Sequence, residues 1–327
     1  MNRSSLVKRI SSLMLCLILS SVILSADKDS AVLKFIIDDT LPPVIFADVP
    51  VYKEAIIEKE EHEMFEYILF DDTVTDEYAK ENYYIVSDRT GFKDGDIDIN
   101  AFNSMDLTIN KDAKGPQVLI FHTHSSEMFA DSDISKGLSE GIWGVGEELK
   151  NILEKEYGLK VYHDTGQYDV VDGKMSTLGS YERMEPEVKK ILEKYSTIEL
   201  VIDLHRDGLP EGSDKLITEI NGEQCARIML FNGLTRLNED GELTDLDELK
   251  NPYIKENLAL SYRVYQNSEK RFPGLMRKMY MEAYRYSLHM RPKSMLVEVG
   301  AQNNLKQEAK NSMKYLAAAI ADTVLCE

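Results

Sequence analysis

The feature that most constrains the fold is an alternation of short apolar runs and helical segments after residue 111. Val118–Phe121 is a continuous apolar run. A helix is predicted after it, because apolar residues recur at i, i+4, i+7 and i+8 from Val145 to Leu153, and Gly158 stands where a C-cap belongs. Apolar strands separated by helices of this length predict an α/β fold, with a mostly parallel central sheet and helices on both faces.

The same alternation continues to the end of the chain, without an internal repeat. Further strands are predicted at 159–162, 200–202, 227–231 and 295–297, and further amphipathic helices at 184–195 and 309–324. We therefore predict one folded domain over residues 111–327.

Residues 1–26 are predicted to carry the chain to a membrane. Lys8 and Arg9 precede 17 uncharged residues, which as a helix would span about 25 Å, near the lower limit for a bilayer. A cleaved secretory signal has the same pattern, but cleavage after Ala26 would place Leu24 where a small residue is preferred. We favour an uncleaved, single-pass anchor in the cell membrane, whose positive flank leaves the rest of the chain extracytoplasmic.

Residues 27–110 are predicted to be an acidic linker or spacer. They hold 21 Asp and Glu against seven Lys and Arg, and the whole chain has a formal charge of −19. Such a segment repels itself and has few apolar residues to bury. The acidic balance also excludes a nucleic-acid partner, which needs clustered Lys and Arg, and three Cys provide no zinc-finger spacing.

Ligand-type side chains follow three of the predicted strands, where the chemistry of such sheets gathers. The sequence HTHSSE occupies 122–127, DLHRDG occupies 203–208, and Glu298 begins EVG at 298–300. Because these ends meet in one crevice, the sequence predicts a metal site there.

A hydrolytic zinc site takes three protein ligands, often two His and one Glu, and keeps a fourth position for water. His124 and His205 would supply the imidazoles, and Glu127 would turn back from the segment after the strand. Glu298 would then remain free as the general base. Asp203 is placed to orient a ligand imidazole.

Several of these residues have alternative interpretations. Glu298 would also be explained by a salt bridge to Arg291 or Lys293, since a buried carboxylate needs a partner or a function. Arg206 would steady a substrate carboxylate or pair with Asp207.

Two further residues near the predicted second helix, Tyr181 and Arg183, are interpreted as structural rather than as contacts to substrate.

The strand plus HTHSSE, the strand plus DLHRDG, and VEVG at 297–300 together resemble the stage II sporulation protein P family of endospore-forming bacteria. Supporting pieces are Val145-Gly146 at a helix start and His163-Asp164 after a strand. The resemblance covers about residues 111–327 and the N-terminal anchor.

This resemblance implies an amidase-like fold, Zn²⁺ as cofactor and peptidoglycan as substrate. The family is similar to zinc-dependent N-acetylmuramoyl-L-alanine amidases, and its members degrade septal peptidoglycan during forespore engulfment. They remove stem peptides from glycan strands and also cut peptide crosslinks as endopeptidases. The implied partners are a lytic transglycosylase, stage II sporulation protein D, and a membrane protein, stage II sporulation protein M. By motif, His124, His205 and Glu298 take the zinc-ligand and catalytic roles.

The resemblance leaves the third ligand open. Glu127 fits the HTH-x-x-E pattern of the sporulation family, whereas Glu140 or Glu147 would match the position used by related amidases. His122 would be an alternative ligand or would support one from behind, because it lies on the same side as His124 if the strand continues.

The competing functions are an inactive module that binds peptidoglycan or recruits the engulfment machinery, and a D,D- or L,D-metallopeptidase that cuts only crosslinks.

Overall fold

The computed structural model describes residues 74–325, and its elements alternate along the chain as predicted for an α/β fold. In chain order they are α4 (Asp76–Asn82), β1 (Tyr84–Val86), α5 (Ile99–Ser104), β2 (Val118–Phe121), η3 (Ile134–Lys136), η4 (Leu138–Glu140), α6 (Ile142–Tyr157), β3 (Val161–His163), β4 (Val170–Val171), β5 (Lys174–Met175), α7 (Ser180–Lys194), β6 (Leu200–Asp207), β7 (Ile217–Ile220), β8 (Glu223–Ala226), β9 (Ile228–Gly233), β10 (Arg236–Glu239), β11 (Glu242–Asp245), η5 (Asp247–Leu249), α8 (Ile254–Arg271), β12 (Met279–Glu282), β13 (Ser294–Ala301) and α9 (Lys306–Val324).

The central sheet has seven strands in the order β1-β12-β9-β13-β6-β2-β3. Neighbouring strands are parallel throughout, except that β13 and β9 run antiparallel. The prediction of a mostly parallel central sheet is therefore confirmed. Strands β1 and β12 and helix α8 were not predicted.

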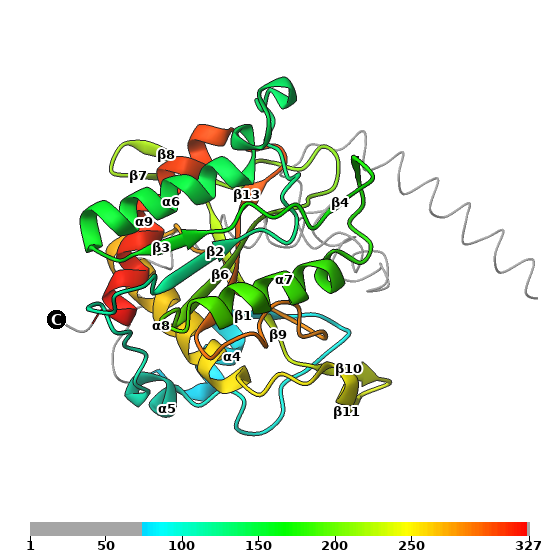
Figure 1. Ribbon diagram of the computed structural model, residues 1–327. Helices are drawn as coiled ribbons and strands as arrows, with labels where there is room; N and C mark the ends of the chain where they lie inside the picture. The colour runs from blue at the N-terminus through cyan, green and yellow to red at the C-terminus, as the bar shows by residue number, and fades with distance from the viewer. Residues whose placement is uncertain (1–73, 326–327) are drawn as a thin grey trace, which may run out of the picture. The chain divides into compact units, whose positions relative to one another are not determined.

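Helices cover both faces of this sheet, as predicted. In Figure 1, α6 lies on one side of β2 and β3 and α7 lies on the other. Buried side chains of α6, α8 and α9 join alternate strand residues such as Leu204 and Val297 in one apolar cluster. The residues of α7 pack in a second cluster with Leu119, Phe121 and Val201 from the opposite face of β2 and β6.

Strands β6 and β13 are longer than predicted, and their pairing sets the positions of the polar residues they carry. The strand predicted at 200–202 continues to Asp207, so His205 lies inside β6 rather than after it. Glu298 of β13 is the register partner of His205. Directly paired residues share a face of the sheet, so both side chains lie on the α7 side. The register shifts between Glu298 and Ala301, where Gly300 has a φ of 60°.

The prediction of a spacer over residues 27–110 is wrong for residues 74–110. β1 pairs with β12 at one edge of the central sheet. Tyr83 and Phe102 are fully buried, and the ring of Phe102 lies 5.8 Å from that of Tyr262 on α8. The high charge of the segment concealed this, because its acidic residues lie mostly outside and its few apolar residues inside. The remainder of that predicted spacer, residues 27–73, lies outside the described residues.

The predicted membrane anchor, residues 1–26, also lies outside the described residues. Within residues 74–325, no helix combines the length and the apolar character that crossing a bilayer requires.

We expect Phe102→Ala to lower the free energy of unfolding of the whole chain by about 3–5 kcal/mol, because it removes a buried ring from the contact with α8. Urea denaturation followed by circular dichroism would measure this. Asn103→Ala, at the neighbouring exposed position, is the control and should change the free energy by less than about 0.5 kcal/mol. Equal stability of the two variants would contradict the inclusion of residues 74–110 in the folded unit.

Candidate metal centre

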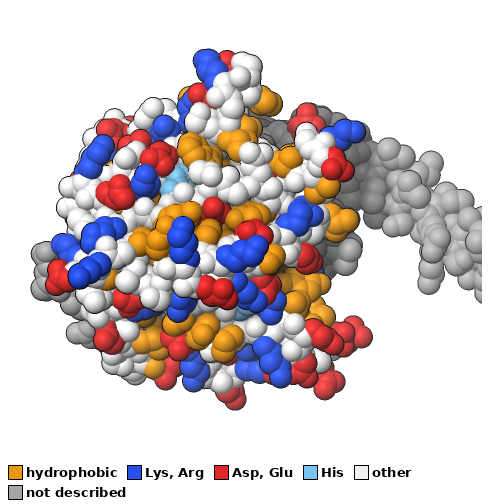
Figure 2. All heavy atoms as spheres, in the orientation of Figure 1, with side chains coloured by type: hydrophobic (Ala, Val, Ile, Leu, Met, Phe, Trp, Pro, Cys, Tyr) orange, Lys and Arg blue, Asp and Glu red, His pale blue; other side chains and the backbone are white. Residues whose placement is uncertain are grey.

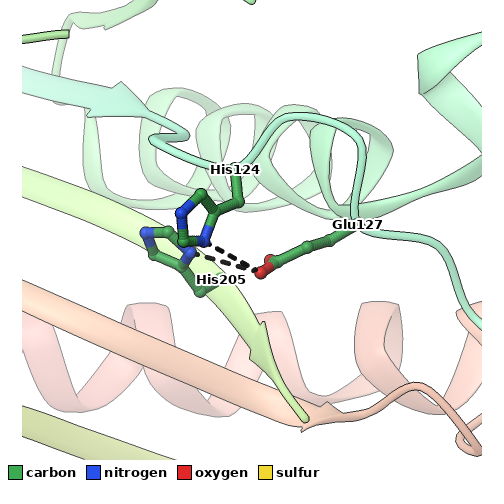
Figure 3. Close-up of side chains that lie close together, drawn as sticks. All are labelled: His124, Glu127 and His205. Atoms are coloured by element: carbon green, nitrogen blue, oxygen red, sulfur yellow. Dashed lines mark ion pairs between the residues drawn. The ribbon is translucent and has the colours of Figure 1, made fainter. Parts of the chain in front are cut away.

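Three predicted ligands, His124, Glu127 and His205, lie together on the α7 face of the central sheet, next to the carboxyl end of β2 (Figure 3). One ligand atom from each falls within 4.8 Å of the others. The Nδ1 atoms of both imidazoles lie 3.5 Å from Oε1 of Glu127. His124 comes from the turn after β2 and His205 from β6, so segments distant in sequence build the cluster.

The spacing of the cluster fits a tetrahedral metal ion. Ligand atoms bonded at about 2.0–2.2 Å in a tetrahedron lie about 3.4 Å apart. Both nitrogen–oxygen separations, 3.5 Å, agree with that value. Two imidazoles and one carboxylate are also the donor set that zinc takes in hydrolytic sites.

Each side chain of the cluster is held by a second group. Nε2 of His205 donates to Oδ1 of Asp203 at 2.7 Å, and Nε2 of His124 lies 3.0 Å from Oγ of Ser180. With the proton on Nε2, each ring presents the lone pair of Nδ1 to the centre. Oε2 of Glu127 accepts the backbone N–H of Arg206 at 2.9 Å, which leaves Oε1 for the centre.

Two buried carboxylates hold the loop that carries His124 and Glu127: Asp203 in β6 of the central sheet, and Asp169 in the turn before β4. Asp203 accepts both the backbone N–H and the hydroxyl of Thr123. Asp169 accepts the hydroxyl of Ser125 at 2.7 Å and the N–H of the next residue at 2.9 Å. These contacts inside the protein therefore fix the position of the loop.

The start of α6 packs against the other end of this loop. The N–H of Ile142 donates to the carbonyl oxygen of Glu127 at 2.9 Å. A Cβ at Gly141 would lie 2.2 Å from that same oxygen, so only glycine permits the approach.

Electrostatics favour a cation at the cluster. Burial alone would raise the pKa of Glu127, but the charge of His205 and hydrogen bonds from both imidazoles and Arg206 lower that pKa to about 2. Burial alone would lower the pKa of His205, but the carboxylates of Asp203 and Glu127 raise it well above its ordinary value. Two ionised carboxylates thus surround one imidazole, and a bound cation would balance the excess negative charge.

Glu298 lies beside the cluster on the neighbouring strand, and its carboxyl group forms no ion pair with any residue of 74–325. Burial raises the pKa of Glu298 to about 8; the charge of His205 opposes this rise, and Glu127 adds to it. Its Oε2 atom is buried and has no hydrogen-bond partner among the described residues.

The alternative salt bridge from Glu298 to Arg291 or Lys293 is not formed in the described structure. Arg291 donates to the carbonyl oxygen of Leu192, and Lys293 pairs with Glu199. Glu298 is therefore a half-buried acid whose buried Oε2 atom has no partner in the described structure, the kind of group that marks a functional site.

The other proposed ligands lie elsewhere. Glu140 pairs with Lys306, and Glu147 pairs with His163 and Lys150. His122 points to the opposite side from His124: its Nδ1 donates to the carbonyl oxygen of Leu204, and its Nε2 lies 2.9 Å from Nε2 of His163. The expectation that His122 and His124 share a side is wrong, because β2 ends at Phe121 and a turn follows.

The side chain of Arg206 donates hydrogen bonds to backbone carbonyl oxygens. Its Nε donates to the carbonyl oxygen of Met128, and one terminal nitrogen donates to the carbonyl oxygen of Asp207. The carboxylate of Asp207 instead pairs with Arg277 at 2.7 Å. The predicted Arg206–Asp207 carboxylate pair is therefore not formed.

Sequence reasoning missed two residues next to the centre. Ser180, the first residue of α7, holds His124. The ring of Tyr181, interpreted as structural from the sequence, lies 5.9 Å from that of His124 in an edge-on contact. Nothing in the sequence singles out either residue, because both reach the site only through the packing of α7 on the sheet.

We expect Ser180→Ala to weaken Zn²⁺ binding about 10- to 100-fold, because His124 would lose the partner that fixes its ring. Competition with a chromogenic chelator measures this affinity. Thr177→Ala, at a nearby exposed position, is the matched control and should bind Zn²⁺ like the unmodified chain. An unchanged affinity in folded Ser180→Ala would rule out Ser180 as the group that orients a metal ligand.

Solved structures that are similar to this chain include two amidases. N-acetylmuramoyl-L-alanine amidase AmiC2 of Nostoc punctiforme is 16% identical, with a TM-score of 0.35 over 64% of this chain and 97% of that one. The CwlD amidase from Clostridioides difficile, solved in complex with the GerS lipoprotein, is 14% identical, with a TM-score of 0.37 over 62% of this chain and 94% of that one.

Among curated proteins, stage II sporulation protein P of Bacillus subtilis (strain 168) is 22% identical over 218 residues, which are 63% of this chain. The chain spans about half the length of that relative, 50%. The family model of stage II sporulation protein P (SpoIIP) matches residues 44–321, most of the sequence. The chain therefore belongs to the stage II sporulation protein P family.

Proposed function

We propose that this protein is a zinc-dependent peptidoglycan hydrolase that cleaves amide bonds. The observation that carries the proposal is the convergence of His124, Glu127 and His205 beside the unsatisfied acid Glu298. Three ligands from two separate segments, together with a spare acid of raised pKa, are the components of metal-assisted hydrolysis.

Family membership supports peptidoglycan as the substrate and sporulation as the setting. The proposed reaction is that of an N-acetylmuramoyl-L-alanine amidase, which removes stem peptides from glycan strands, with endopeptidase activity on peptide crosslinks in addition. The proposed place of action is the septum during forespore engulfment.

In the proposed mechanism, Zn²⁺ would lower the pKa of water to about 7 and polarise the scissile carbonyl. Glu298 accepts the proton of the attacking water and hands it to the amine that leaves. Asp203 keeps the proton on Nε2 of His205 and stabilises that ring against rotation. The backbone N–H of Arg206 holds Glu127 in place through the reaction.

For localisation, we propose that residues 1–26 anchor the chain in the cell membrane and that the folded unit acts outside the cytoplasm. The proposed partners are stage II sporulation protein D, which cuts the glycan, and stage II sporulation protein M in the membrane.

Mass spectrometry of purified peptidoglycan after incubation with the chain separates this function from its competitors. An amidase releases stem peptides and leaves glycan without them. A metallopeptidase opens crosslinks and leaves peptides on the glycan, and a binding module releases nothing. The absence of released stem peptides would refute the amidase activity.

We expect Glu298→Gln to lower kcat for stem-peptide release about 10²- to 10⁴-fold, because the amide cannot take a proton from water. Zinc content should stay that of the unmodified chain, since Glu298 is outside the ligand set. Glu242→Gln, on the exposed strand β11, is the control and should keep full activity. Full activity of Glu298→Gln would exclude Glu298 as the base.

Removal of the metal by a chelator should abolish activity, and added Zn²⁺ should restore it in the unmodified chain. His205→Ala should show neither stoichiometric zinc nor activity after the same treatment, because the ligand set falls to two. Metal analysis by plasma mass spectrometry checks the zinc content, and circular dichroism checks the fold. Full zinc in folded His205→Ala would overturn the ligand assignment.

A further inference from the structure

Among residues 74–325, no helix covers the whole of the sheet face that carries the candidate metal centre. The apolar residues of α7 pack on β2 and β6, and none of the residues in that cluster comes from β9 or β12. On the same face, β9 and β12 present Phe231 and Tyr280, which are register partners and only half-buried. Their rings lie 5.4 Å apart.

A continuous series of aromatic rings joins this surface to the metal centre. The ring of Tyr181, next to His124, lies 5.5 Å from that of Tyr286. Tyr286 is 4.8 Å from Phe231 and 6.4 Å from Tyr284, whose side chain is 40% exposed. We call the rings of Tyr181, Phe231, Tyr280, Tyr284 and Tyr286 the aromatic surface.

Close packing and ion pairs hold the loop that carries Tyr284 and Tyr286 in place. A Cβ at Gly233 would lie 1.9 Å from the carbonyl oxygen of Tyr284, so glycine lets the loop lie directly on the end of β9. Tyr286 has a φ of 50°, a strained conformation for an aromatic residue. Glu185 on α7 ties the loop down, because it pairs with Arg285 at 2.8 Å and with His289 at 3.4 Å.

Polar groups stand at the rim of the aromatic surface. Arg89, whose side chain is 57% exposed, pairs with the buried carboxylate of Glu282 at the end of β12. Figure 2 shows acidic and basic side chains interspersed on the face in view, without a broad field of one sign. Because Arg89 and Glu282 compensate each other's charge at this rim, a ligand of the aromatic surface would be held by stacking and hydrogen bonds rather than by its net charge.

We propose that the aromatic surface binds the glycan strand of peptidoglycan and thereby places the muramoyl amide at the metal centre. Sugar rings are flat on an apolar C–H face and polar at their edges, which matches half-exposed aromatic rings bordered by donors and acceptors. From β6 to β12 the sheet spans about 14 Å, so more than one sugar ring fits across it. This inference rests on the proposed function, because an amidase must hold sugar on one side of the bond it cuts.

The first test measures binding of peptide-free glycan strands to the full chain. We expect Tyr284→Ala and Tyr280→Ala each to weaken binding about two- to tenfold, and Tyr284→Trp to retain it, since a ring remains for stacking. Tyr162→Ala is the matched control: Tyr162 is also half-buried and stacks on another tyrosine, Tyr195, but it lies on β3 at the far edge of the sheet. Thermal unfolding of each variant confirms that it is folded.

The second test compares kinetics on long glycan substrates with those on a substrate of one muramoyl unit. We expect Tyr284→Ala to raise KM for long strands and to lower the ratio of the two kcat/KM values, whereas Tyr162→Ala keeps both. The inference would be overturned if the chain bound no glycan strands, or if Tyr284→Ala bound them as tightly as the unmodified chain does. Loss of binding to isolated stem peptides, with strand binding kept, would overturn it in favour of a peptide site.

The two proposals fail in different ways. If the chain releases stem peptides but its binding of glycan strands is unchanged by substitution of Tyr280 and Tyr284, the glycan-binding role of the aromatic surface is wrong and the proposed hydrolase stands. If strands bind through these rings but no bond is cut, the hydrolase is wrong and the glycan surface stands.

Discussion

The candidate metal centre depends on one buried carboxylate. Asp203 lies inside β6, is fully buried, and accepts hydrogen bonds from the backbone and side chain of Thr123 and from the ring of His205. It therefore joins the loop after β2 to the ring presented by β6. Without Asp203, the loop after β2 would lose the hydrogen bonds that hold it against β6. The buried ring of His205 would also lose the hydrogen-bond acceptor that fixes its tautomer.

The pairing of strands in the sheet fixes the positions of His205 and Glu298 relative to each other. His205 and Glu298 are neighbours because β6 and β13 are paired in a fixed register, so the separation between ligand and acid is a property of the backbone. The single antiparallel junction, between β13 and β9, lies immediately beside them. Beyond that junction no helix in the described part of the chain packs on the α7 face, and the aromatic surface lies next to the candidate metal centre.

The part of the site that the sequence could predict is the part that follows buried strands directly. Apolar runs that end in His, Glu and Asp place His124, His205 and Glu298 toward the carboxyl ends of neighbouring strands by topology alone. The direction of His122 was not predictable, since it depends on whether the strand continues beyond Phe121, and a turn follows there instead. Ser180 reaches His124 only through helix packing over 56 positions of sequence. Helix α8 was missed because its buried positions include polar residues such as Asn257 and Gln266, which interrupt apolar periodicity.

The irregularity in β13 determines where the chain tolerates insertions and deletions. Before Glu298, adding or removing one residue would reverse the side chain to the opposite, apolar face and remove the acid from the centre. After it, the register already shifts, and Gly300 adopts a backbone conformation that accommodates an extra residue. Length variation among natural homologues should therefore be concentrated downstream of Glu298 and be absent from the stretch between Ser294 and Glu298.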